Sequence, residues 1–182
     1  SLLSAIKMAI DCRLLDKKDL RILVDRDCLA YDNFKNMGVQ TEQYFFKSSE
    51  DFSSYAKNYF INCDVVFLYY TRKVSEPLLG HLPVINFHPS LLPAFKGLHA
   101  IEDAFHSGVR FVGATSHLTT DKIDEGPIIG QIMSPIPVNN DFTIKELKRL
   151  SYVHVVYLSL SCIELLSQNK LNFTSYNEIV WN

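Results

Sequence analysis

The sequence predicts an α/β fold, a mostly parallel twisted sheet with helices on both faces. Two observations predict this class: helical and strand-like patterns alternate along the chain, and the strand-like runs are short and largely apolar. Such runs are typical of parallel strands that are buried on both faces. A chain of 182 residues has the length of one domain, so we expect a single domain over residues 1–182.

The predicted helices show helical spacing of apolar residues or clear boundary residues, and they cover residues 2–10, 28–37, 49–61, 98–107 and 143–166. The predicted strands cover residues 20–24, 43–46, 64–70, 83–87, 111–118 and 127–136. Ser49, which two acidic residues follow, fits the start of a helix. Gly38 and Gly108 each fit the end of one.

The chain begins inside a predicted helix, whereas a βαβ unit begins with a strand. The first strand of the sheet, and the turn after it, are therefore not accounted for by residues 1–182. In folds of this kind that turn commonly binds phosphate. Two alternatives stay open: these residues precede Ser1 in a longer chain, or the protein works without them.

Composition argues against several functional classes. The net charge of −2 gives no basic surface for nucleic acid or anionic lipid. No run reaches the ~18 unbroken apolar residues of a membrane span, and residues 153–166 come closest. The four cysteines form no Cys-x-x-Cys pair, so neither a zinc site nor a disulfide framework is predicted. We expect no bound metal and a reduced, cytoplasmic compartment.

A polar pair stands at the end of the predicted strand 83–87. Asn86 and His88 are two residues apart, so in an extended chain they point to the same side. Pro89 and Pro93 then stiffen the chain as it leaves the strand. Ligands of open α/β sheets bind beyond the carboxyl ends of the strands. The pair therefore lies where a ligand is expected.

A second polar cluster follows the predicted strand 111–118. His117 ends this strand, and the loop after it carries Asp121, Asp124 and Glu125 before Gly126. If both loops lie at the same sheet edge, Asp124 can reach His88. Taken one at a time these residues are ordinary, because an Asn at a strand end is usually a turn residue and an acidic loop is usually just solvated.

An amide, an imidazole and a carboxylate together suit acyl transfer to an amine. The Asn86 amide can donate to a carbonyl oxygen as it becomes negative, and His88 can pass a proton to the oxyanion or to the leaving nitrogen. Asp124 can orient and charge the histidine and accept the excess proton of the amine. No Gly-x-Ser-x-Gly nucleophile motif is present. The other histidines, His81, His99, His106 and His154, form no metal-ligand motif and are expected to be ordinary polar side chains.

Two long motifs resemble the folate-dependent formyltransferase family. They are NFHPSLLPAFKGLHAIEDAF, residues 86–105, and GATSHLTTDKIDEGPIIGQ, residues 113–131. The members they resemble most are glycinamide ribonucleotide formyltransferase and formyltetrahydrofolate deformylase. The resemblance is strong over residues 84–138 and weaker over most of the remainder. It implies a Rossmann-like formyltransferase domain in which 10-formyltetrahydrofolate is the formyl donor.

The resemblance also implies roles for particular residues. Asn86, His88 and Asp124 resemble the catalytic trio of the family, and His117 its supporting histidine. Two segments resemble the walls of the folate pocket, where main-chain groups hold the pterin ring. With Asn86, the implied folate-binding residues are Thr71, Arg72, Lys73, Val74, Thr120, Asp121, Lys122, Ile123 and Asp124.

The part of the family pattern that binds the acceptor is altered. Of the Gly-Asn-Gly-Ser-Asn turn that binds phosphate in the ribonucleotide enzyme only Ser1 is present, and Leu2 follows it. Tyr69 stands where a small residue is usual, and Val153 where a glutamate precedes the family's histidine. We therefore expect intact formyl chemistry and a divergent acceptor.

The resemblance leaves three functions to separate. The first is transfer of a formyl group to a small-molecule amine, as in purine biosynthesis and one-carbon metabolism. The second is deformylase activity, in which the same residues use water as the acceptor. The third is a folate-binding module without turnover, which the complete trio disfavours. No nucleic-acid or membrane partner is expected, and the oligomeric state is left open.

Overall fold

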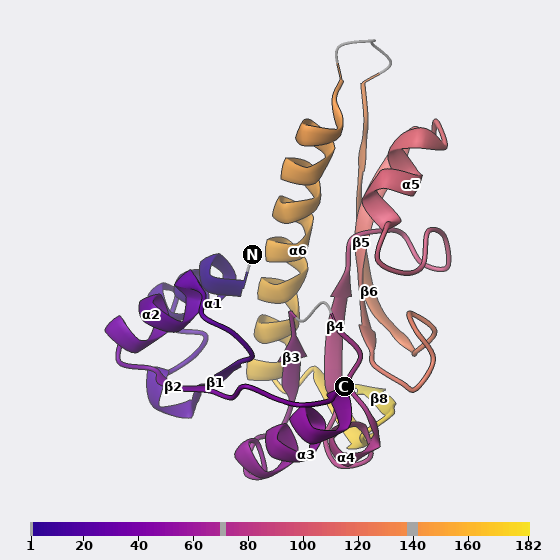
Figure 1. The fold of residues 1–182 in the computed structure, drawn as a ribbon. Coiled ribbons are helices and arrows are strands. Elements are labelled where there is room, and N and C mark those ends of the chain that lie inside the picture. Colours follow the sequence, from indigo (N-terminus) through magenta and orange to yellow (C-terminus); the bar gives the residue numbers. More distant parts are fainter. Residues whose placement is uncertain (1, 70–71, 138–141) are drawn as a thin grey trace.

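The computed structural model describes residues 2–69, 72–137 and 142–182. Its helices and strands alternate along the chain as expected (Figure 1). They are α1 (Leu2–Asp11), the short 3-10 helix η1 (Lys17–Asp19), β1 (Arg21–Val24), α2 (Leu29–Asn36), β2 (Gln40–Gln43), α3 (Ser49–Tyr59), β3 (Val66–Leu68), α4 (Glu76–Leu79), β4 (Val84–His88), α5 (Ala100–His106), β5 (Phe111–Leu118), β6 (Ile128–Pro135), α6 (Ile144–Ser167), β7 (Leu171–Ser175) and β8 (Glu178–Trp181).

The strands form three groups. β3, β4, β5 and β6 make a four-stranded sheet in that order, β1 pairs with β2, and β7 pairs with β8. The α/β class and the Rossmann-like sheet are confirmed, with one correction to strand direction. β1–β2 and β3–β4 are parallel, but β4–β5 and β5–β6 are antiparallel. The loop between β5 and β6 contains no crossover helix, and two adjacent strands joined in this way run in opposite directions.

Several element boundaries differ from the prediction. The strand expected at residues 43–46 lies at 40–43, because Gln40 pairs with Arg21 although the segment has no apolar run. Ser48, not Ser49, caps α3, and its hydroxyl accepts from the N–H of Asp51. The hairpin of β7 and β8 was not predicted. Residue 70, in the predicted strand 64–70, lies outside the described residues.

Helices cover both faces of the sheet, as expected. On one face, Leu158 and Cys162 of α6 pack with Ile85, Phe87 and Leu118 of the sheet. The other face of β3 and β4 packs against α3 and α4 through a separate buried cluster: Phe52, Ala56, Val66, Val74, Leu78, Leu79, Leu82 and Val84. Alternate residues of β4 thus belong to opposite layers, which directs Asn86 and His88 away from α6.

α6 is the longest helix, with 24 residues. Thr143 and Glu146 form a capping box at its start. Its length and apolar composition alone would allow it to cross a membrane. In this fold its buried residues instead pack along β4, β5 and β6, as in the core helix of a globular domain (Figure 1).

Candidate active site

The candidate site lies on the face of β4 and β5 that carries Asn86, His88 and His117, beside two loops, residues 89–99 and 119–127. Asn86 pairs with His117 across the two antiparallel strands, and His88 follows on the same face of β4. His88 and His117 are 4% and 1% exposed, whereas Asn86 is only half-buried. The amide is therefore the member of this group that a ligand can reach most directly.

Both ring nitrogens of His88 have partners. Nε2 lies 2.8 Å from the main-chain oxygen of Phe95, which can only accept, so Nε2 carries a hydrogen and donates. Nδ1 lies 3.3 Å from Oδ2 of Asp124. The predicted proximity of His88 and Asp124 is confirmed.

Two opposing effects act on the charge of His88. Burial lowers the pKa of His88, because the charged imidazolium loses water. The Phe95 oxygen and the negative charge of Asp124 act in the opposite direction without cancelling the effect of burial. When Nδ1 is protonated it can donate to Asp124, and when it is neutral its lone pair faces the carboxylate. The net effect favours the neutral form of His88. When Nδ1 is protonated, Asp124 is close enough to accept a hydrogen bond from it.

Asp124 is fixed by the loop after β4. The main-chain N–H of Gly97 donates to its Oδ2 at 2.7 Å, and its side chain is only 8% exposed. Burial alone would raise the pKa of this carboxyl group, but hydrogen bonds from His117 and Gly97 and the charge of His88 outweigh burial and lower it. The Gly97 hydrogen bond does not depend on the proton of any histidine. Asp124 is therefore held as a buried carboxylate.

His117 connects the amide and the carboxylate. Its Nδ1 lies 2.9 Å from the main-chain oxygen of Leu118, so Nδ1 donates. Its Nε2 lies 3.2 Å from Nδ2 of Asn86 and 3.5 Å from Oδ1 of Asp124. Neutral His117 accepts from the Asn86 amide, and protonated His117 donates to Asp124. The neutral form orients Asn86 with its second N–H left for a ligand.

The loop after β4 is held by side chains that sequence reasoning did not single out. The hydroxyl of Thr115 donates to the main-chain oxygen of Ser90 and accepts from the N–H of Leu92, and Gln131 donates to Leu92. These bonds fix the chain that presents the Phe95 oxygen and the Gly97 N–H. In the sequence, Thr115 and Gln131 were marked only by their position within the family-like motif of residues 113–131.

The predicted folate-binding residues fall into different environments. Val74 is 2% exposed and belongs to the core, so only its main chain is available to a ligand. Arg72 lies over the ring of Phe46 and 3.9 Å from Asp25. Arg72, Lys73, Asp121, Lys122 and Ile123 are exposed, Thr120 and Asp124 are intermediate, and Thr71 lies outside the described residues. Their role in folate binding stays a prediction.

Gly126 lies where its backbone closely approaches that of Leu118. It is buried, and a Cβ atom placed on it would lie 1.7 Å from the main-chain oxygen of Leu118. A glycine is needed here because the two backbones approach closely. The loop containing Asp124 is therefore anchored at Gly126.

Tyr69 packs on the α6 side of the sheet, and its role at the acceptor site stays a prediction. It stacks on Phe87 and its hydroxyl bonds that of Ser159 in α6. Tyr69 thus lies on the α6 face, whereas Asn86 and His88 point away from α6. Phe87 likewise packs with α6, away from the candidate site.

Known proteins resemble this chain in sequence and fold. Residues 34–151 match the family model described as formyl transferase. The chain belongs to the formyl transferase family. Within this family, formyltetrahydrofolate deformylase from Escherichia coli O6:H1 is 32% identical over 132 residues, which are 71% of this chain and 45% of that protein. Phosphoribosylglycinamide formyltransferase from Bacillus subtilis is 45% identical over 64 residues, 34% of this chain and 33% of that protein.

The fold comparison gives the same family. The structure of glycinamide ribonucleotide transformylase 1 from Symbiobacterium toebii superposes with a TM-score of 0.85 and 28% identity. The superposition covers 98% of this chain and 87% of that one. The chain spans about half the length of the curated deformylases that it matches.

Proposed function

We propose that this protein transfers a formyl group from 10-formyltetrahydrofolate to a small-molecule amine. The observation that carries the proposal is the contact of His88 Nδ1 with Asp124 Oδ2 at 3.3 Å, next to the half-buried amide of Asn86. A donor, an acid and a carboxylate at one sheet edge are the groups that acyl transfer to an amine needs.

Each group has one role in the proposed reaction. The amine nitrogen attacks the formyl carbon, a carbon–nitrogen bond forms, and the formyl oxygen becomes negative. The Asn86 N–H and protonated His88 stabilise this oxyanion. Asp124 accepts the excess proton of the amine. The oxyanion then re-forms the carbonyl, the bond to N10 of the folate breaks, and N10 takes up a proton from His88. Donation from His88 Nε2 requires that its hydrogen bond to Phe95 opens.

Hydrolysis of the same donor is the second candidate. It is favoured by the deformylase relatives, whose similarity extends over 71% of the chain. Water then replaces the amine as the nucleophile, and formate leaves. A folate-binding module without turnover is the third candidate, and the complete group of Asn86, His88 and Asp124 disfavours it.

One experiment separates these functions. The protein is incubated with 10-formyltetrahydrofolate, with and without a panel of candidate amines, and tetrahydrofolate, formate and formylated amine are measured. Amine-dependent loss of the formyl group supports the transferase. Formate released equally without amine supports the hydrolase, and folate binding without either product supports the passive module.

The compartment remains part of the proposal. Cys12, Cys28, Cys63 and Cys162 are free thiols in the structure. Free thiols are usual in a reducing compartment, which supports a cytoplasmic location.

A further inference from the structure

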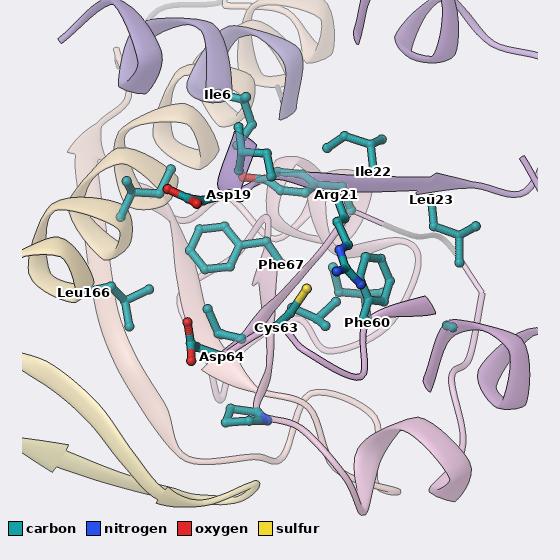
Figure 2. A pocket seen from close by; sticks show the side chains of 18 of the residues that line it. Ile6, Asp19, Arg21, Ile22, Leu23, Phe60, Cys63, Asp64, Phe67 and Leu166 are labelled. Carbon is teal, nitrogen blue, oxygen red and sulfur yellow. The ribbon is translucent and has the colours of Figure 1, made fainter. Parts of the chain in front are cut away.

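Two cavities differ in their relation to the candidate site. The larger one, of ≈ 1390 Å³, lies between β1 and β3, and Figure 2 shows the labelled side chains around it. Asn86, His88 and Asp124 are not among its lining residues. The smaller one, of ≈ 170 Å³, lies where the loop after β4 meets α5, β5 and α6, and we call it the Phe95 cavity. Phe95 lines it, and the main-chain oxygen of Phe95 is the partner of His88 Nε2.

The walls of the Phe95 cavity are mostly apolar. Ala104 of α5, Val112 of β5 and Leu147 of α6 line it and form one buried cluster. The side chain of Phe95 packs against this cluster. Phe111 also lines the cavity and is 52% exposed, so a ligand has a route from the surface. An apolar cavity of about 150 Å³ can bind benzene, so the Phe95 cavity has the size and the lining for one six-membered ring.

His154 gives the Phe95 cavity one polar atom without a partner. Its side chain is 2% exposed and lines the cavity from α6. Nε2 lies 2.7 Å from Oγ of Ser134, a residue that does not line the cavity. Nδ1 is buried and has no hydrogen-bond partner among the described residues. Because buried polar atoms in proteins are nearly always hydrogen-bonded, a bound molecule is expected to supply the partner of Nδ1.

These features together define the ligand. We propose that the Phe95 cavity binds a small neutral molecule made of one aromatic ring and one hydroxyl group, with the hydroxyl bonded to Nδ1 of His154. The ring can pack edge to face or offset against Phe95 and Phe111. Burial lowers the pKa of His154, which favours the neutral imidazole. When Nε2 donates to Ser134, Nδ1 has a lone pair that accepts from the hydroxyl of the ligand.

A ligand in the Phe95 cavity also acts on the candidate site. Phe95 has a φ of 53°, which is uncommon for a bulky residue, and the hydroxyl of Ser90 donates to its oxygen at 3.2 Å. A bound ring occupies the space into which the Phe95 side chain could move, so the Phe95 oxygen stays on His88 Nε2. The proposed reaction requires this hydrogen bond to open, and the ligand should therefore slow formyl release. Only this effect on turnover rests on the proposed function.

The binding test compares phenol with benzene on the full chain. The methyl resonances of Ala104, Val112 and Leu147 are followed by NMR while each molecule is added. Phenol holds its water more strongly than benzene, so without a polar partner in the cavity it would bind more weakly. With Nδ1 as the partner we expect phenol to bind more tightly than benzene, by roughly 3–10-fold. No shift of these resonances with phenol, or phenol binding no tighter than benzene, overturns the proposal.

Two variants locate the ligand. His154→Phe keeps a buried ring and removes Nδ1, so in this variant benzene should bind more tightly than phenol. Ala104→Leu adds side-chain volume inside the cavity and should abolish binding of both molecules. Thermal unfolding checks that each variant is folded, and the comparison on the parent protein stands without them. Parental affinity for phenol in folded Ala104→Leu would place the ligand elsewhere and overturn the proposal.

The contact with the candidate site is tested on His88 itself. Phenol should slow the exchange of the Nε2 hydrogen of His88 with solvent by roughly 3-fold or more, because the bond to the Phe95 oxygen opens less often. Formyl release from 10-formyltetrahydrofolate is measured in parallel and should fall. Slower exchange with unchanged formyl release supports the ligand site and counts against the proposed function. Unchanged exchange in the phenol-bound protein overturns the action of the ligand on His88.

Discussion

Gly97 donates its main-chain N–H to Oδ2 of Asp124 at 2.7 Å, and the same oxygen lies 3.3 Å from His88 Nδ1. The carboxylate therefore joins the loop after β4 to the loop after β5. Both partners have left-handed backbone conformations, with φ of 89° at Gly97 and 54° at Asp124. A residue with a side chain keeps this conformation only where surrounding contacts hold it. At Asp124 the contacts of the carboxylate with Gly97 and His88 hold it.

The first prediction concerns the charge of Asp124. Asp124→Asn keeps the shape and an oxygen that accepts from Gly97, and asparagine tolerates a positive φ. It removes the negative charge that faces His88. We expect formyl release from 10-formyltetrahydrofolate to fall by ~10²-fold or more, while the protein stays folded with a lower thermal midpoint, because the stabilisation by the charged carboxylate is lost. Single-turnover kinetics and thermal unfolding measure the two effects.

Glu125→Gln is the matched control for this prediction. Glu125 is the next residue in the same loop, exposed and paired with Lys96 at 2.8 Å. Surface ion pairs contribute little, so activity and stability should stay close to those of the parent protein. Equal activity of the two variants would remove Asp124 from the proposed mechanism.

The second prediction concerns pH. Burial lowers the pKa of His88 below its ordinary value of 6.5, so the unfolded chain binds the proton more readily than the folded chain does. Acidification through the range below 6.5 should therefore reduce the free energy of unfolding. Replacement by asparagine removes this group, and His88→Asn should flatten the pH dependence. Urea unfolding from about pH 7.5 to about pH 5.5 measures the slope.

Two other groups must be separated from His88 in this experiment. Burial also lowers the pKa of His154, with the same sign, so the difference between parent and variant is the informative quantity. The lowered pKa of Asp124 stabilises the fold above its unfolded value of 3.8, and this contribution is lost only at lower pH. The exposed His106, changed to Gln, is the control. If His88→Asn leaves the pH dependence of the free energy of unfolding unaltered, the lowered pKa of His88 is contradicted.

The third prediction concerns the anchor of the Asp124 loop. Gly126→Ala places a methyl group 1.7 Å from the Leu118 oxygen, so one of the two backbones must move. We expect a loss of roughly 2–4 kcal/mol in the free energy of unfolding, measured by urea denaturation. We also expect reduced formyl release, because Asp124 moves with the loop.

Gly108→Ala separates this steric effect from the general cost of replacing a glycine. Gly108 has a φ of 71°, and no atom lies within 4 Å of the place that an added Cβ would take, so only backbone strain of about 1–2 kcal/mol is expected. Formyl release should be unchanged in this variant. A smaller loss of stability in Gly126→Ala than in Gly108→Ala would show that the contact with Leu118 is not restrictive.

The fourth prediction concerns the donor. A non-reactive folate analogue should slow hydrogen exchange in residues 72–74 and 120–124, because a flat pterin offers edge donors and acceptors to main-chain groups. The β7–β8 hairpin is the internal control and should not respond. Protection of neither segment by a saturating analogue would reject the donor assignment.

Much of the candidate site could be predicted from side-chain identity. The two-residue spacing of Asn86 and His88 placed them on one face of a strand, and the position of Asp124 after the next strand brought it to His88. The roles of the Phe95 oxygen and the Gly97 N–H could not be predicted in this way, because every residue has these groups. They depend on the path of the loop, which Thr115 fixes from another strand.

The errors in the fold have similar causes. β2 is a polar strand, so its pairing with β1 left no apolar pattern in the sequence. The β7–β8 hairpin did leave one. Leu171 and Phe173 alternate with polar residues, and a second apolar run, Ile179–Trp181, follows after a short polar turn.

The last prediction is that glycinamide ribonucleotide is a poor acceptor for this chain as written. A phosphate group needs several main-chain N–H groups or a cation, commonly at a glycine-rich turn that opens a helix. The first turn of α1 has the apolar residues Leu2 and Leu3, and the hydroxyl of Ser4 is bonded to Tyr152 at 2.6 Å.

Steady-state kinetics with the ribonucleotide test it. Because the described residues Leu2–Ser4 supply no cation and no free hydroxyl for a phosphate, we expect weak saturation, with a KM above ~1 mM. We expect better turnover of a smaller or more apolar amine such as an amino sugar. Val153, 44% exposed on α6, offers a comparison, since Val153→Glu restores the carboxylate of the family pattern. If that carboxylate contributes to acceptor binding, the variant should lower KM for the ribonucleotide and leave amine-independent formate release unchanged. Efficient turnover of the ribonucleotide by the parent chain at micromolar concentration would contradict the prediction and support purine synthesis as the function.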